Sequence, residues 1–257
     1  MSILKQLSKD GLEQTEDRVG GGSFTTPSGV HLGKVEYAYL DTYKSGSHFL
    51  AVSIKWPDGK TFRDQLFIAK ANGENFWEKD GKKTAFPGYT ILDDLALMIT
   101  GFEASDLDEP EEKIIKKRNF ETGQDENVAV QMLTQLVGGD VALGIIESIE
   151  TKMDKNPTTG EYDIPTDVEF KKNTIDKVFH PETLLTVTEA RNGLEQGQFV
   201  EKWKEANEGK LRDKRYKGNK AVKSGAPARS PASAGAAPKP GAPAGGAAKK
   251  PLFGVKK

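Results

Sequence analysis

The stretch that decides the fold is VHLGKVEYAYLDTYKSGSHFLAVSIKWPDGKTFRDQLFIAK, residues 30–70. Apolar and polar residues alternate through most of it, which is the period of a β-strand with one buried face. The alternation is interrupted at Ser45-Gly46-Ser47 and at Pro57-Asp58-Gly59-Lys60, whose residue types are typical of tight turns. The stretch therefore predicts three successive antiparallel strands.

The two faces of these predicted strands differ in chemistry. Leu50, Val52 and Ile54 form the expected core face of the second strand. The opposite face of the second and third strands gathers Phe49, Lys55, Arg63 and Phe67, and the first strand adds Lys34, Tyr37, Tyr39 and Tyr43 beside them. Single-stranded nucleic acid needs aromatic rings for its unstacked bases and cations for its phosphates. The combined pattern predicts a DNA-binding surface, although any one aromatic residue in a strand is more often part of the core.

A second candidate surface follows the third strand. Its aromatic and basic residues are Phe76, Trp77, Lys79, Lys82 and Lys83, around a turn at Asp80-Gly81. We interpret it as a basic flap over the predicted strands. Trp77, taken alone, is more typical of a core residue.

The remaining folded part predicts one helix between the third and fourth strands. Ile91, Leu95 and Met98 recur at helical spacing after Pro87, and Gly101 marks the helix end. We expect a short helical turn at 113–117, a helix within 124–137, a fourth strand at 140–153 and a fifth at 165–179. This order predicts a mainly β fold with helices (α+β), built on a five-stranded OB-fold barrel. A last helix around Trp203 closes it, and packing is expected to end near Leu211.

Charge is distributed unevenly along the chain. The net charge is −1, yet residues 214–257 hold 11 basic and no acidic side chains, which leaves the rest at −12. Such a tail favours polyanions, meaning nucleic acid, an acidic protein face or the acidic body of this protein; the alternative is that it only keeps the chain soluble. We expect a flexible segment at 1–29, the OB-fold domain at 30–212, a disordered Ala/Pro/Gly-rich linker at 213–248 and an interaction tip at 249–257. The tip residues that we expect to contact a partner are Lys249, Lys250, Phe253, Lys256 and Lys257.

Several functional classes are disfavoured by composition. The chain has no cysteine and no apolar run long enough for a secretion signal or membrane span, so we expect a cytoplasmic protein, in the host cytoplasm if it is viral. The three histidines, at 31, 48 and 180, lack metal-site spacing. The acidic run 106–112 is a weak candidate for a nuclease metal site, and 154–163 imitates a calcium loop but fits a hairpin turn better. We therefore expect no catalytic residue, no metal, no cofactor and no enzymatic activity.

A family resemblance adds to this interpretation. Over roughly residues 30–205 the chain resembles the single-stranded DNA-binding proteins of lytic, podovirus-type bacteriophages. The residues that carry the likeness are Gly33-Lys34-Val35 through Ala38, the hairpin to Trp56, Phe86-Pro87-Gly88-Tyr89, Leu136-Val137-Gly138, and Val178-Phe179 with Leu185-Thr186-Val187-Thr188-Glu189. The resemblance implies an OB-fold protein that coats single-stranded phage DNA during replication, recombination and repair.

The C-terminal tip departs from that family. Its members typically end in an acidic tail with a final aromatic residue that recruits replication proteins, whereas residues 249–257 are basic. The tip is similar to that of one phage branch, which also activates late transcription by contacting host RNA polymerase. The resemblance therefore implies host RNA polymerase or phage replication proteins as partners. The alternative function is a phage structural or scaffold-type interaction protein whose basic tail binds nucleic acid.

Overall fold

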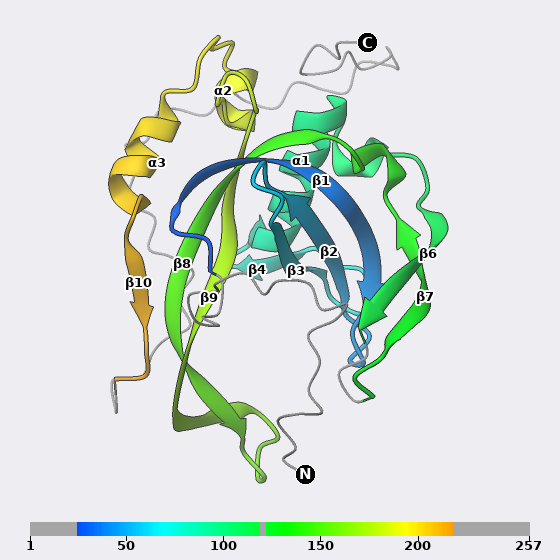
Figure 1. Ribbon diagram of the computed structural model, residues 1–257, viewed down its shortest axis with the longest axis vertical. Helices are drawn as coiled ribbons and strands as arrows, with labels where there is room; N and C mark the ends of the chain where they lie inside the picture. Colours follow the sequence, from blue (N-terminus) through cyan, green and yellow to red (C-terminus); the bar gives the residue numbers. More distant parts are fainter. Residues whose placement is uncertain (1–24, 119–121, 218–257) are drawn as a thin grey trace, which may run out of the picture.

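Strands dominate the computed structural model, which describes residues 25–118 and 122–217 (Figure 1). The strands are β1 Gly29–Thr42, β2 His48–Lys55, β3 Thr61–Ala69, β4 Phe76–Lys79, β5 Lys82–Ala85, β6 Glu111–Arg118, β7 Asp125–Met132, β8 Asp140–Lys155, β9 Tyr162–Phe179 and β10 Leu211–Lys214. The helices are α1 Pro87–Thr100, α2 Val187–Arg191 and α3 Phe199–Asn207, with 3₁₀ turns η2 Ala104–Asp106 and η3 Thr134–Leu136. The mainly β, α+β class is thereby confirmed.

Eight of the strands form one open sheet. Its central order is β10-β8-β1-β2-β3, with β9 on β8 and the β6–β7 hairpin joined to β1 through β7. All pairings are antiparallel except that of β10 with β8. The expected closed five-stranded barrel is not observed, because the sheet order does not join β3 to β9 by a backbone ladder. The two strands meet instead where the backbone N–H of Ile175 donates to the Asp64 carboxylate at 3.4 Å.

Strand β1 connects the parts of this sheet because it has different partners along its length. Residues 29–34 pair with β8, whereas residues 34–42 pair with β2. The register shifts between Val35 and Tyr37, and such irregularities bend a strand. Gly33 lies two residues before this shift, and a Cβ atom there would approach Ile54 and Trp56 to 2.5 and 2.7 Å. The strand can therefore arch from β8 to the β6–β7 hairpin (Figure 1).

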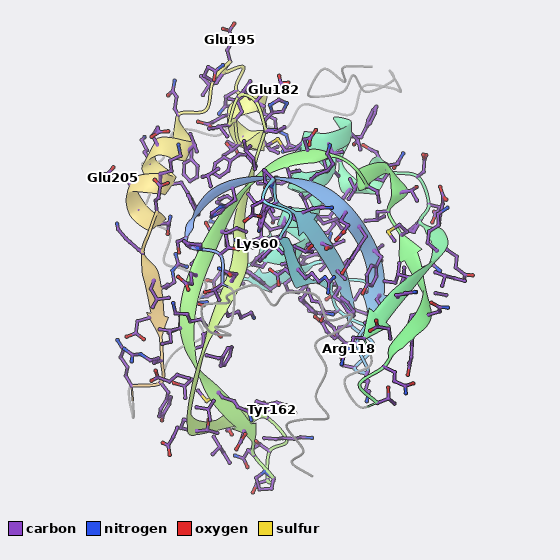
Figure 2. All side chains as sticks on the ribbon, in the orientation of Figure 1. Lys60, Arg118, Tyr162, Glu182, Glu195 and Glu205 are labelled. Atoms are coloured by element: carbon purple, nitrogen blue, oxygen red, sulfur yellow. The ribbon has the colours of Figure 1, made fainter. Side chains whose placement is uncertain are left out.

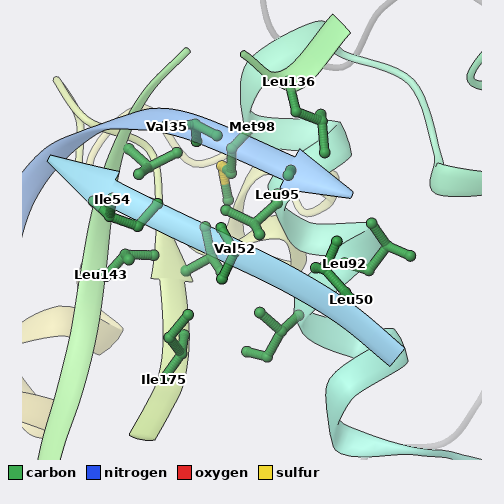
Figure 3. Packing of buried hydrophobic residues seen from close by; sticks show 14 of the residues in the cluster. Val35, Leu50, Val52, Ile54, Leu92, Leu95, Met98, Leu136, Leu143 and Ile175 are labelled. Carbon is green, nitrogen blue, oxygen red and sulfur yellow. The ribbon is translucent and has the colours of Figure 1, made fainter. Parts of the chain in front are cut away.

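The core lies between the sheet and α1 (Figure 3). The predicted face of β2 is buried there, with Leu50 and Ile54 fully enclosed, and Leu95 of α1 packs into the same cluster. The helix begins at Pro87 and ends at Gly101, whose φ of 81° suits glycine, as predicted. At Gly88 a Cβ atom would come within 2.2 Å of the Phe67 carbonyl oxygen, so only glycine allows α1 to approach β3 this closely.

Two predicted helical segments are wrong. Residues 113–117 and most of 124–137 form the β6–β7 hairpin, and only Thr134–Leu136 is helical. Val128, Val130 and Met132 alternate at the period of a strand, and pairing of β7 with β1 stabilises that arrangement. The strands predicted at 140–153 and 165–179 are confirmed as β8 and β9, with longer ranges. Strand pairing also continues past Leu211, because β10 pairs with β8 as far as Lys214, so residues 213 and 214 of the predicted disordered linker lie in a strand.

Helix α3 covers one end of the sheet. Trp203 packs against Phe179 with ring centroids 6.1 Å apart, and its indole N–H donates to Asp176 at 2.7 Å. No helix in the described part of the chain is long and apolar enough to span a membrane. The predicted linker and tip, beyond residue 217, and residues 1–24 of the predicted flexible segment lie outside the described residues.

Candidate nucleic-acid interface

The strand register brings the predicted site residues of β1, β2 and β3 onto one side of the sheet. Phe49 lies opposite Phe67, and Ser53 lies between Tyr37 and Arg63. Lys34 lies opposite Lys55 at the other end of the same side. We call this surface the outer face, and it comprises Lys34, Tyr37, Tyr39, Phe49, Lys55, Arg63 and Phe67.

Two of these aromatic residues, both predicted to bind DNA, are buried and not exposed as stacking on a base requires. Tyr39 is 3% exposed and Phe49 5% exposed, because both pack with Val130 and Met132 of the β6–β7 hairpin. Lys117 extends over the Tyr39 ring, with its Nζ 5.9 Å from the ring centroid. The hairpin therefore turns this half of the outer face into a second hydrophobic core, and it also leaves Tyr37 only half-exposed.

Three cations and one ring of the outer face are exposed to solvent: Lys34 and Lys55 lie at its far end, and the other two lie beside that buried cluster. Lys55 and Arg63 are exposed, and Phe67 is 38% exposed. Burial raises the pKa of Tyr39, and the nearby Tyr37 and Asp41 raise it further, while the positive charge of Arg63 opposes them. Arg63 is thus close enough to interact electrostatically with Tyr39. Tyr43, in the turn after β1, is also exposed, and its ring centroid lies 4.3 Å from that of Phe49.

A cavity of about 710 Å³ adjoins Lys34 and Lys55 at the other end of the outer face. Its apolar lining includes Leu32, Val35, Trp56, Pro57, Val141 and Pro181. Lys34 forms an ion pair with Asp140 at 2.8 Å, whereas the structure gives Lys55 no ion pair within residues 25–118 and 122–217. Lys55 is therefore the cation here that is available to a phosphate.

The predicted flap is the β4–β5 hairpin. Phe86, which follows it, has its ring 4.8 Å from that of Phe67 and 5.4 Å from that of Trp77. The Nζ of Lys83 lies 4.4 Å from the Phe76 ring centroid, and Lys79 and Lys82 are exposed. The buried Phe86, which sequence reasoning missed, thus joins the flap to the outer face. Trp77 is half-buried in this contact.

The predicted β8–β9 hairpin projects beyond the rest of the sheet (Figure 1), and sequence reasoning missed the exposed apolar residues on it. It carries exposed apolar side chains along β9, with Tyr162 70% exposed at its far end (Figure 2). The others are Ile164, Val168 and Phe170. The signal that could have indicated them was the alternation of Val168, Phe170 and Lys172, which predicts that the three share a face.

The histidines and acidic residues considered as metal or catalytic sites do not form a common cluster in the described part of the chain. The histidines contact different neighbours: His31 lies 5.6 Å from the Trp56 ring, His48 bonds Thr42, and His180 bonds Thr183. Within the described ranges, no three His, Cys, Asp or Glu side chains are grouped closely enough to hold a metal ion. Residues 154–163, whose sequence resembles a calcium-binding loop, contain the turn between β8 and β9, as expected of a hairpin.

Comparison with protein-family models, curated proteins and solved structures found no match for this chain. Its function is therefore inferred from the positions and chemistry of the residues described above.

Proposed function

We propose that this protein is a non-enzymatic single-stranded DNA-binding protein that coats DNA largely without sequence specificity. The observation that carries the proposal is the grouping of exposed Lys55, Arg63 and Phe67 on the outer face of adjacent strands. Cations there can follow the phosphates while a base lies on the ring. Following the family resemblance, we propose roles in phage DNA replication, recombination and repair.

We also propose that β1, β2, β3, β8 and β9 form a barrel of OB type. The order β3-β2-β1-β8-β9, with α1 between β3 and β8 along the chain, supports this assignment. The Asp64 hydrogen bond to Ile175 would close the barrel between β3 and β9 in place of a backbone ladder. OB barrels bind nucleic acid across strands 2 and 3, which correspond to β2 and β3.

The geometry suggests how a strand would lie. Arg63 and Lys55 would hold successive phosphates, and Phe67 would stack on a base between the outer face and the β4–β5 hairpin. Lys79 and Lys82 of that hairpin would bind further phosphates from the side of the strand opposite the outer face. Because every base has a stacking face, binding by rings and cations tolerates any sequence.

A fluorescence titration tests this function. Tyrosine and tryptophan emission is followed as oligo(dT) of increasing length, and then duplex DNA, are added to the full chain at several salt concentrations. We expect quenching by single strands only, and affinity that falls steeply with salt because bound cations release counterions. Failure of every single strand to bind would contradict the proposal.

Neutralising the two outer-face cations should weaken binding selectively. We expect Lys55→Gln/Arg63→Gln to reduce the salt slope of oligo(dT) binding by about 1.4, or about 0.7 for each phosphate that no longer meets a cation. The matched control is Lys116→Gln/Arg118→Gln, which also removes one lysine and one arginine charge. These two residues lie on the side of β6 opposite to Lys117. An equal loss in both variants would mean that general charge, and not the outer face, determines affinity.

A second candidate function is that of a phage structural or scaffold-type interaction protein. The observation that favours it is the apolar exposure of the β8–β9 hairpin at Tyr162, Ile164 and Val168, since exposed apolar patches mark protein–protein contacts. Under this function the basic tail alone would bind nucleic acid. The same titration repeated with a variant that lacks residues 218–257 separates the two, because under this second function the deletion would abolish all DNA binding.

We further propose, from the resemblance, that the tip at 249–257 contacts host RNA polymerase or a phage replication protein. Deletion of residues 251–257 is expected to weaken capture of purified bacterial RNA polymerase by at least about tenfold, the effect of losing one strong interface residue. Oligo(dT) affinity should remain nearly constant. The control is deletion of 240–246, an uncharged stretch of equal length. Unchanged polymerase capture after removal of the tip would refute this role.

A further inference from the structure

The β8–β9 hairpin and β10 form a three-stranded arm with two chemically different faces. Strand register places Lys172, Ser148 and Arg212 in one row and Phe170, Glu150 and Lys214 in the next. These rows share one side of the arm, because residues two apart in a strand point the same way. Tyr216 lies beyond the end of β10, between Arg215 and Lys217. Both of those side chains bind Asp213 on the other side of the arm, so we place the Tyr216 ring on this side. Its backbone N–H donates to Thr151 Oγ1 at 2.9 Å. We call this side the cationic face, defined by Phe170, Lys172, Arg212, Lys214 and Tyr216.

The opposite face of the arm is electrically balanced by ion pairs. Lys171 binds Glu147 at 2.9 Å, and Arg215 binds Asp213 at 3.0 Å and Glu169 at 3.5 Å. Lys217 also binds Asp213, at 3.3 Å. The cations on that side are therefore already matched by carboxylates, and little positive charge is left for a ligand.

The cationic face retains its positive charge. Its one carboxylate in these rows, Glu150, pairs with Lys214 at 3.2 Å. Within the described residues the structure gives no ion pair to Lys172 or Arg212. The two rings beside them reach solvent, with Phe170 42% and Tyr216 39% exposed. Arg212 donates to Asn207 Oδ1 at 3.2 Å. Burial raises the pKa of Asp64, and the positive charge of Lys172 acts to lower it. The face thus offers two rings and two cations without an ion pair on one exposed sheet surface.

We infer that the cationic face is a second contact site for single-stranded DNA, separate from the outer face. This rests on the proposed function and lengthens the path of the bound strand. Stacking on Phe170 and Tyr216 would hold two bases, while Lys172 and Arg212 would bind the phosphates between them. A flat stacking surface suits a single strand, since a duplex keeps its base faces inside the helix. Protein interfaces, in contrast, are depleted in lysine at their centres.

The sequence after the arm supports the same ligand. Residues 218–257 begin directly after Lys217 and carry eight further basic and no acidic side chains. A strand that lies on the cationic face would therefore end near Lys217, the residue after which this basic sequence begins. A protein partner that carries both signs of charge would be attracted less strongly by these successive basic residues than a single strand of DNA.

The test measures affinity for oligo(dT) as a function of length in full-chain variants. For strands long enough to reach the arm, we expect Phe170→Ala/Tyr216→Ala to weaken binding by at least about fivefold, the lower limit for losing one stacked base. Lys172→Gln/Arg212→Gln should lower the salt slope by about 1.4 for the same strands. The matched control, Lys171→Gln/Arg215→Gln, makes the same charge change on the balanced face and should leave the slope unaltered. Short strands should bind all variants as they bind the natural sequence.

The outcomes separate this inference from the function on which it rests. If the natural sequence binds no oligo(dT) of any length, the proposed function fails. If it binds, but both cationic-face variants keep its affinity and salt slope at every length, the inference is overturned and the function stands. A Phe170→Trp variant provides an independent measurement, because it keeps a ring at this position. Its added fluorescence should be quenched by long strands and not by short ones, and equal emission with and without long strands would also overturn the inference.

Discussion

Replacing Phe49 with alanine is expected to lower the free energy of unfolding by about 3–5 kcal/mol. The ring is 5% exposed and lies between β2 and the β6–β7 hairpin, against Tyr39, Val130 and Met132. Its removal would leave a cavity in this second core, because β7 is also held in place by its pairing with β1, and β6 by its pairing with β7. Urea unfolding followed by circular dichroism measures the loss.

The comparison with Phe67→Ala distinguishes a packing residue from a binding residue. Phe67 lies opposite Phe49 in the register but is 38% exposed, so its removal should cost much less stability. Oligo(dT) affinity should fall by at least about fivefold, as expected when one base no longer stacks on a ring. If Phe49→Ala proved as stable as the natural sequence and bound DNA more weakly instead, the buried position of Phe49 would be contradicted.

Asp94→Asn is expected to stabilise the protein at alkaline pH. Burial raises the pKa of Asp94 from 3.8 to about 6, and Asp93 adds to this, although Lys177 and Arg191 act in the opposite direction. A raised carboxyl pKa means that folding favours the protonated form. The stability that protonation contributes is complete below pH 3.8 and is lost as the pH rises through about 6. Ionised Asp94 therefore destabilises the fold by up to about 3 kcal/mol at pH 8.

Asp94→Asn should accordingly raise the free energy of unfolding by up to about 3 kcal/mol at pH 8 and by less than about 1 kcal/mol at pH 4. Urea unfolding at the two pH values measures both differences. Asp154→Asn removes an exposed carboxylate near Lys152 and should change stability by less than about 1 kcal/mol at either pH. A gain that is equal at both pH values would show that ionisation of Asp94 is not the cause.

Local patterns predicted the central meander and its core face correctly. Alternation in residues 48–55 identified Leu50, Val52 and Ile54 as buried, and turn residues placed the ends of β2 and β3 within a few positions. The helix from Pro87 to Thr100 was predicted because its apolar stripe, its proline and its final glycine all agree. In these segments the local preference and the tertiary environment favour the same structure.

The β6–β7 hairpin was missed because its local signals conflict. Lys113 to Lys117 mixes β-branched and basic residues, and Val128, Met132 and Leu136 also fit a helical spacing. Pairing of Met132 with Tyr39 resolves the ambiguity in favour of a strand. That pairing joins distant parts of the chain, and a window of neighbouring residues contains no information about it.

The sequence by itself determined which side chains share a face of β1, β2 and β3, because strand geometry makes neighbours alternate. It also determined the acidic body and the basic tail. Only the tertiary structure decided which part of that face is covered, since the β6–β7 hairpin buries Tyr39 and Phe49 while Lys55, Arg63 and Phe67 stay exposed. Tertiary pairing of β10 with β8 likewise created the cationic face of the arm. Burial depends on what packs against a side chain, and here the residues that do so come from remote segments.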